Sequence, residues 1–205
     1  MTVTTIGNHR LLCGDITDGA VQDLMGAERA DVVYSDPPWG PGNQRYWHTH
    51  NGTNPRTDWL AFLDCFAGAV ADHRKPDAPV LVEMGLRWLG DLDAAMAAVG
   101  LPFRRRWRIF YGPRSKPLPN ALCLYGPRDL DLEVDGLRGE PITRAALAAA
   151  VSPGDVVLDP CTGLGMTARV THAIGGRFRG SEMNAARLAR TEAWLRRRID
   201  REARR

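Results

Sequence analysis

Residues 154–167 read Gly-Asp-Val-Val-Leu-Asp-Pro-Cys-Thr-Gly-Leu-Gly-Met-Thr, and this stretch decides the fold. Its first apolar residues predict a short strand that ends at Asp159-Pro160. Gly163 and Gly165 follow, and both can turn the backbone tightly and bring it close to a ligand. The residues after the second glycine predict a helix. A strand, a glycine-rich turn and a helix in this order indicate one unit of a parallel α/β sheet.

The rest of the chain repeats this alternation. Strands are predicted over residues 10–13, 31–35, 79–83, 106–111, 121–125, 155–158 and 177–181. Helices are predicted over residues 18–26, 58–73, 87–99, 142–151, 166–174 and 184–203. We therefore expect an α/β fold with a doubly wound, mostly parallel seven-stranded sheet, built as one domain over residues 1–205. Turn residues between 112 and 119 predict a hairpin within a small basic and aromatic insert near 103–120.

The motif Asp36-Pro37-Pro38-Trp39, the first of two along the chain, follows the predicted strand 31–35. It suits chemistry at the exocyclic amino group of a nucleobase, whose lone pair is delocalised into the ring. The carboxylate of Asp36 and the carbonyl of Pro37 can accept both N–H hydrogens and so localise that lone pair. The prolines remove backbone donors and stiffen the turn, and Trp39 offers a face for base stacking, worth about 1–3 kcal/mol. Taken alone, the motif also fits an ordinary turn.

The glycine turn fits two cofactors that contain adenosine. Gly163-x-Gly165-x-x-Ala168 matches a dinucleotide fingerprint, and Glu182 stands near the spacing expected for an acid that binds ribose hydroxyls. S-adenosylmethionine fits better, because the carboxylate of Asp159 would repel a pyrophosphate but suits a cationic amino group and a sulfonium. The alternative is a nicotinamide dinucleotide as cofactor. A nicotinamide enzyme would have no role for the Asp-Pro-Pro-Trp motif.

With both motifs in view, the chain resembles the β-class of amino-methyltransferases, best known as adenine-N6 and cytosine-N4 DNA methylases. In that class the catalytic motif precedes the cofactor motif, as it does here. The resemblance implies a Rossmann-like methyltransferase fold with an antiparallel strand near the end of the sheet, and S-adenosyl-L-methionine as cofactor. Where the family usually has Phe and Ser in the cofactor loop, this chain has Cys161 and Leu164, which alters the packing of the pocket.

The resemblance also assigns site residues. The catalytic set is Asp36, Pro37, Pro38 and Trp39. The cofactor-binding set is Asp15, Asp159, Pro160, Gly163, Gly165, Thr167 and Glu182, and Asp15 of the Gly14-Asp15 pair is expected to contact the cofactor adenine. No metal site is predicted, because the neighbouring histidines His48 and His50 have no evident partners.

Two segments are candidates for substrate contact. The loop over 40–57 directly follows the catalytic motif, and because a long loop in a compact domain is usually functional, we expect it to close over the substrate base. The 103–120 insert interleaves basic and aromatic residues, a pattern that suits a phosphate backbone and unstacked bases. The predicted substrate-binding set is Arg45, Tyr46, Trp47, His48, Arg106, Arg108, Arg114 and Lys116. A mobile surface loop and a strand with outward-facing arginines are the alternative interpretations.

Composition favours a globular protein over a membrane or secreted one. The 205 residues are 44% hydrophobic and 25% charged, and the net charge is +3. No apolar run reaches the roughly 18 residues that a membrane span needs, and no secretion signal is predicted. The 4 cysteines are scattered singly. That spacing argues against disulfides and a cysteine zinc site, and it favours a cytoplasmic protein.

The function predicted from these observations is transfer of a methyl group from S-adenosylmethionine to the N6 of adenine in DNA. Asp rather than Ser before Pro-Pro favours adenine. Cytosine-N4 methylation, adenine-N6 methylation of RNA and a non-catalytic nucleic-acid-binding subunit are the alternatives. No segment is long enough for a separate target-recognition domain, so target choice is expected from the 40–57 loop, the 103–120 insert, a homodimer or a partner subunit. Restriction-modification, phage defence and regulation are all compatible roles.

Overall fold

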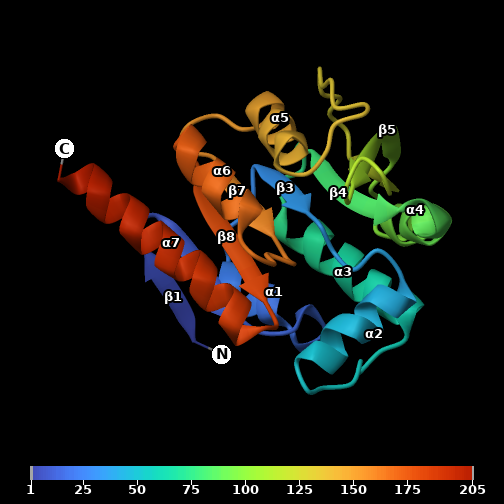
Figure 1. Ribbon diagram of the computed structural model, residues 1–205, viewed down its shortest axis with the longest axis horizontal. Coiled ribbons are helices and arrows are strands. Elements are labelled where there is room, and N and C mark those ends of the chain that lie inside the picture. The colour runs from blue at the N-terminus through green and yellow to red at the C-terminus, as the bar shows by residue number, and fades with distance from the viewer. Residues whose placement is uncertain (1, 205) are drawn as a thin grey trace.

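The computed structural model describes residues 2–204, whose strands form one eight-stranded sheet (Figure 1). The strands are β1 (Val3–Ile6), β2 (His9–Cys13), β3 (Val32–Ser35), β4 (Val80–Gly85), β5 (Phe103–Tyr111), β6 (Leu118–Tyr125), β7 (Val156–Asp159) and β8 (Arg177–Glu182). Their order across the sheet is β1-β2-β8-β7-β3-β4-β6-β5. Strands β2, β8, β7, β3 and β4 are parallel, β1 is antiparallel to β2, and β6 is antiparallel to both its neighbours. The predicted mostly parallel sheet with an antiparallel strand near its end is confirmed.

The sequence predicts seven strands, and this number is wrong because β1 forms an additional edge strand. It pairs with β2 through a two-residue turn at Gly7-Asn8, where Gly7 has a φ of 54°. All of its residues are β-branched, which favours a strand. A Gly-Asn pair between two such runs is also a hairpin signal. Both local signals point to the strand that the sequence prediction omits.

Helices cover both faces of the sheet. They are α1 (Ala20–Met25), α2 (Pro41–His50), α3 (Trp59–His73), α4 (Leu89–Ala98), α5 (Glu140–Ala150), α6 (Met166–Ile174) and α7 (Ala185–Ala203). Helices α1, α3 and α4 share an apolar core with Val33 on one face, whereas α5 and α6 pack with Val32 on the other, and α7 packs over β2 and β8. Adjacent residues of β3 therefore point to opposite faces, and the predicted doubly wound arrangement is confirmed. Among residues 2–204, no helix combines the length and apolar character that a membrane span requires.

The segment predicted as a loop over 40–57 contains the helix α2, so the prediction of a continuous loop is wrong. Pro41 occupies the start of the helix, where its fixed φ and missing N–H are favourable. A Cβ at Gly40 would lie 2.2 Å from Nε1 of Trp88. Close packing against Trp88 therefore requires glycine where the chain leaves the first motif. The following residues, 51–57, lead without a further helix or strand to Asp58, whose side chain caps α3.

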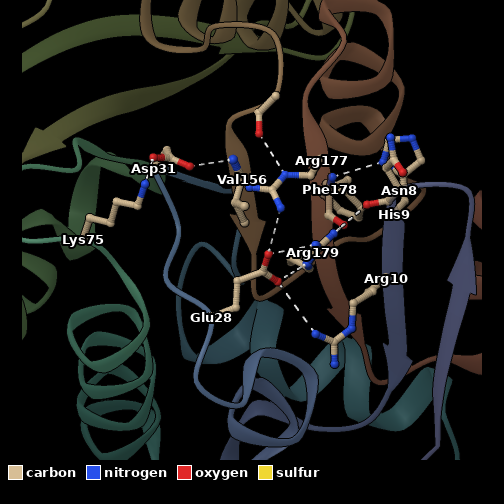
Figure 2. A network of polar contacts seen from close by, with 11 residues as sticks. Asn8, His9, Arg10, Glu28, Asp31, Lys75, Val156, Arg177, Phe178 and Arg179 are labelled. Atoms are coloured by element: carbon tan, nitrogen blue, oxygen red, sulfur yellow. Dashed lines mark hydrogen bonds and ion pairs between the residues drawn. The ribbon is translucent and has the colours of Figure 1, made fainter.

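A polar network ties the elements together at the edge where the parallel strands begin (Figure 2). Glu28, which follows α1, accepts a hydrogen bond from Arg179 of β8 at 2.6 Å, and it lies 3.7 Å from Arg10 and 3.4 Å from Arg177. Arg179 is only 5% exposed, so its charge needs this partner. The charged side chains near the beginnings of the parallel strands thus stabilise the fold. The two predicted motifs lie at the opposite side of the sheet, at the carboxyl ends of the strands.

Candidate active site

The carboxyl ends of the parallel strands border a cavity of about 530 Å³. Both predicted motifs face it, because β3 and β7 are neighbours in the sheet and end at the same edge. The lining includes Asp36, Pro37, Pro38 and Trp39 from the first motif, Asp159, Pro160, Gly163, Thr167 and Glu182 from the second, and also Asp15. Open parallel sheets bind their ligands at this edge. Every predicted catalytic and cofactor-binding residue except Gly165 therefore lies in one cavity.

The turn after β3 holds Trp39 in a defined orientation. Its indole Nε1 donates a hydrogen bond to Oδ1 of Asp36 at 2.5 Å, and its backbone N–H donates to the side chain of Asn43 at 3.2 Å. The ring of Trp39 lies 4.8 Å from that of Tyr111. A Cβ at Gly85 would lie 2.6 Å from the carbonyl oxygen of Trp39, so the turn packs directly on the end of β4. The carboxylate and the aromatic face are thus fixed relative to each other.

Asp36 lies in acidic surroundings. Its side chain meets solvent through the cavity. Desolvation by the surrounding protein, and after that the charge of Glu83, raise the pKa of Asp36 well above its ordinary value, whereas the hydrogen bond from Trp39 lowers it. A carboxylate with a raised pKa is more basic, so it gains more from accepting an N–H hydrogen. The site therefore favours a donor group, such as an amino group, beside Asp36.

Asp159 ends β7 and is buried next to the first motif. Its Oδ1 accepts hydrogen bonds from Oγ of Ser35 at 2.9 Å and from the backbone N–H of Cys161 at 3.1 Å. Burial raises its pKa to about 6, although the hydrogen bonds from Thr167 and Ser35 act in the other direction. No basic side chain of residues 2–204 forms an ion pair with it. A cationic ligand group can supply the missing charge.

Glu182 is the last residue of β8, and its side chain holds the glycine turn in place. Its carboxylate accepts hydrogen bonds from the backbone N–H groups of Gly163, at 2.8 Å, and Asn184, at 2.9 Å. Burial raises the pKa of Glu182, and the charge of Arg187 opposes this. Arg187 itself lines the cavity, with its guanidinium carbon 4.1 Å from the centre of the Trp47 ring. The sequence prediction does not include Arg187, although its position in the first turn of the helix that follows the predicted ribose-binding acid is a usable signal.

The two glycines of the turn have different surroundings. Gly163, with a φ of 57°, lines the cavity, and a Cβ there would point at the Arg187 guanidinium 3.5 Å away. Gly165, with a φ of 77°, lies outside the lining, and a Cβ there would lie 2.4 Å from Oγ1 of Thr191. The left-handed backbone conformation at the cavity wall accounts for glycine at position 163. Gly165 is needed instead for the packing of α6 against α7.

Only half of the predicted substrate residues on α2 face the cavity. Trp47 and His48 line it, and Nε2 of His48 lies 3.8 Å from the Asp15 carboxylate. Arg45 and Tyr46 are exposed on the outer side of the helix. Because Asp15 follows β2, next to Glu182 of β8, α2 covers the half of the cavity formed by the second motif. The helix therefore borders the half of the cavity formed by the second motif as well as the half formed by the first motif.

None of the basic residues predicted on the 103–120 insert lines the cavity. Arg106 is bound to Asp93 at 2.8 Å and lies over the ring of Phe103, so it serves the packing of β5. Arg108, Arg114 and Lys116 are exposed. The last two stand on the turn that follows Tyr111. Since Tyr111 lines the cavity, this turn lies at the cavity edge of the sheet.

The structure adds a buried acid that the sequence prediction does not contain. Glu83, near the end of β4, is 1% exposed and accepts hydrogen bonds from the hydroxyls of Tyr34 and Tyr111. Burial raises its pKa to about 7. All three side chains line the cavity. A single acid near the end of an otherwise apolar strand, beside the strand that leads into the first motif, is the sequence signal that could have found it.

No model of a known protein family matches the chain, and no curated protein sequence matches it. Solved structures do. M1.HpyAVI in complex with S-adenosylmethionine is 13% identical with a TM-score of 0.68, over 90% of this chain and 98% of that chain. TTHA0409 from Thermus thermophilus, inferred to be a DNA modification methylase and also solved with S-adenosylmethionine, is 16% identical with a TM-score of 0.67, over 92% of this chain and 93% of that chain.

The PvuII DNA methyltransferase, which is specific for cytosine N4, is 14% identical with a TM-score of 0.71, over 93% of this chain and 87% of that chain. At such identities the likeness establishes the fold. The chain therefore has the Rossmann-like fold of these methyltransferases over nearly its whole length.

Proposed function

We propose that this chain transfers a methyl group from S-adenosyl-L-methionine to an exocyclic amino group of a base in DNA. The observation that carries the proposal is the placement of Asp36-Pro37-Pro38-Trp39 and of Asp159, Gly163 and Glu182 around one cavity. The first motif suits an amino group, and the second suits a cationic adenosine cofactor. Structures of the same fold that hold S-adenosylmethionine support the choice of cofactor.

The charge of the cavity supports the same cofactor. Asp15, Asp36, Glu83, Asp159 and Glu182 all line it. This acidic lining attracts a sulfonium and an ammonium group and repels a pyrophosphate, which argues against a dinucleotide. In the proposed arrangement Glu182 takes the ribose hydroxyls, Asp15 lies toward the adenine, and Asp159 faces the cationic end of the cofactor.

The proposed reaction is a direct displacement. The target base leaves the duplex at a cost of a few kcal/mol and stacks on Trp39. Asp36 and the carbonyl of Pro37 accept the two amino hydrogens, and the nitrogen lone pair attacks the methyl carbon. The new N–C bond forms as the S–C bond breaks, S-adenosylhomocysteine leaves, and the cationic nitrogen loses a proton to solvent. Positioning and a preorganised acceptor pair supply the acceleration.

Adenine N6 in DNA is the proposed target atom, because Asp rather than Ser precedes Pro37-Pro38. Cytosine N4 is the second candidate, favoured by the fold shared with a cytosine-N4 enzyme. RNA and a non-catalytic subunit remain alternatives with no specific observation in their favour. Target choice through a homodimer or a partner subunit belongs to the same proposal.

The experiment is transfer of radiolabelled methyl from S-adenosylmethionine to unmethylated double-stranded DNA, single-stranded DNA and RNA, with digestion to nucleosides. We expect N6-methyladenine in DNA. Asp36→Ala should abolish transfer and leave S-adenosylhomocysteine binding by calorimetry unchanged. Asp64→Ala, the same change on the exposed side of α3, is the matched control and should retain activity.

Two results would contradict this proposal. Cofactor binding without transfer to any of the three nucleic acids would replace it with the non-catalytic subunit. Transfer retained by Asp36→Ala would remove the mechanism, whichever base is labelled.

A further inference from the structure

Tyr111 is anchored at its hydroxyl end by a buried acid. The hydroxyl donates a hydrogen bond to Oε2 of Glu83 at 2.5 Å. Glu83 is held in turn from its other oxygen, Oε1, which accepts a hydrogen bond from the Tyr34 hydroxyl. Tyr34 also lies 3.3 Å from Oγ1 of Thr143 on α5. The acid therefore links side chains from β3, β4, β5 and α5 into one fixed group at the cavity wall.

The ring of Tyr111 connects this fixed group to the turn that holds Trp39 and Asp36. It lies against Trp39, with 4.8 Å between the ring centres and 44° between the planes. Rings in such contact leave no room for a base between them, so a base that stacks on Trp39 uses its other face. The Trp39 indole N–H meanwhile donates to Asp36 at 2.5 Å. Glu83, Tyr111, Trp39 and Asp36 thus form a continuous chain of contacts.

We propose that Tyr111, anchored by Glu83, is a positioning residue of the target-base subsite, which supports Trp39 from behind and sets its angle to Asp36. The inference rests on the proposed function and assigns a role to residues outside both motifs. Tyr111 does not touch the reacting atoms. It acts through Trp39, because the face that stacks the base and the acid that accepts the amino hydrogens are useful only in a fixed mutual geometry.

The hydroxyl of Tyr111 is the group to remove. Tyr111→Phe keeps the ring and deletes the bond to Glu83, whereas Tyr111→Leu deletes both. We expect Tyr111→Phe to lower the single-turnover rate of methyl transfer by about 10-fold or more, since small misplacements near the chemistry can cost up to about 100-fold. Affinity for S-adenosylhomocysteine should not change. If the ring alone mattered, only Tyr111→Leu would lose rate, and that result would overturn the role of Glu83.

Tyr125→Phe is a matched control for the loss of a buried tyrosine–carboxylate bond. The Tyr125 hydroxyl donates to Asp93 at 2.7 Å, on β6 and away from the cavity. This variant should lose thermal stability and keep its single-turnover rate. Equal rates for Tyr111→Phe and Tyr125→Phe would show that the first bond is structural only.

Trp39→Phe tests whether Tyr111 acts through Trp39. This change removes the indole N–H that reaches Asp36, and it should lower the rate by itself. Added to that background, Tyr111→Phe should cost little more, because both changes break one chain of contacts. Additive losses would overturn the inference. An inactive wild-type chain would instead overturn the proposed function, and the positioning role with it, so the two failures are distinguishable.

Discussion

Arg187 brings a positive charge to the wall of the cavity. Its guanidinium reaches the acidic cavity from α7 and rests on the Trp47 ring, and it makes no ion pair with an acid of residues 2–204. The cofactor proposed above carries one anionic group, the carboxylate of its methionine part. A planar guanidinium suits a carboxylate, which it can bind through two parallel hydrogen bonds.

Arg187→Gln should therefore weaken binding of S-adenosylhomocysteine by about 10-fold or more, as hydrogen bonds between charged groups contribute about 1.5–3 kcal/mol. Binding of 5′-methylthioadenosine, which lacks the carboxylate, should change much less. Calorimetric titration of both ligands measures the difference. Arg190→Gln, an exposed position one turn along α7, is the control. Equal losses for both ligands would assign Arg187 to holding α2 through Trp47 instead.

At the scale of elements, two histidines connect α6 and α7 to the sheet. The backbone N–H of Phe178 donates to Nδ1 of His9 at 3.1 Å, so the proton of a neutral His9 sits on Nε2. Nε2 lies 3.0 Å from Nδ1 of His172, whose Nε2 lies 3.1 Å from Glu202 on α7. Burial, then the charges of His172 and Arg179, lower the pKa of His9 to about 4. Both hydrogen bonds of His9, from the backbone N–H of Phe178 and to His172, require His9 to be neutral.

Acidification should consequently weaken the packing of these elements. Below pH 6.5 the unfolded chain takes up a proton at His9, whereas the folded chain does so only near pH 4. The contribution of neutral His9 to the free energy of unfolding is thus complete above pH 6.5 and is lost as the pH falls toward 4. The loss amounts to about 2 kcal/mol by pH 5. Urea unfolding at pH 7.5 and pH 5 measures it. His9→Asn, which can still accept from Phe178, should show a smaller difference between the two pH values; an identical difference would contradict the assignment.

The elements themselves were largely predictable from local signals. Apolar runs of strand length and helical periodicity indicated seven of the strands and all helices except α2, because each has an apolar face set by its own sequence. The missed helix, α2, has a weak pattern. The segment Pro41–His50 contains glycine and asparagine and has polar residues all round, so its helix depends on packing of Gly40 and on contacts with the cavity wall rather than on propensity.

At the scale of the whole molecule, the site was predictable only as far as strand ends could be paired. Asp36 and Asp159 each stand at the end of a strand of a parallel sheet, which is enough to expect them at one edge. Tyr111 and Glu83 meet through the pairing of β4, β6 and β5, and no local pattern reveals that register. Arg106 shows the opposite error, because its charge looked available in the sequence but is bound to Asp93.

The basic residues of β5 and of the turn that follows it stand at opposite ends of this strand. Arg104 and Arg105 stand where β5 begins, and Arg114 and Lys116 stand on the turn after it ends, at the edge that holds the cavity. In the proposed reaction, a DNA duplex whose base enters the cavity would pass close to that edge. Phosphate contacts should therefore come from the turn and not from the start of the strand, even though both pairs are exposed.

Removing both charges of the turn tests this placement. Arg114→Ser with Lys116→Ser should weaken DNA binding about equally for all sequences and reduce the slope of log affinity against log salt by about 2, one for each lost phosphate contact. Arg104→Ser with Arg105→Ser changes the net charge by the same amount at the far end, so it should leave the slope nearly unchanged. Titration of a DNA duplex at several salt concentrations measures both. Equal slopes for the two double variants would mean that DNA senses only the total charge, and the duplex would then have to approach the cavity along another side.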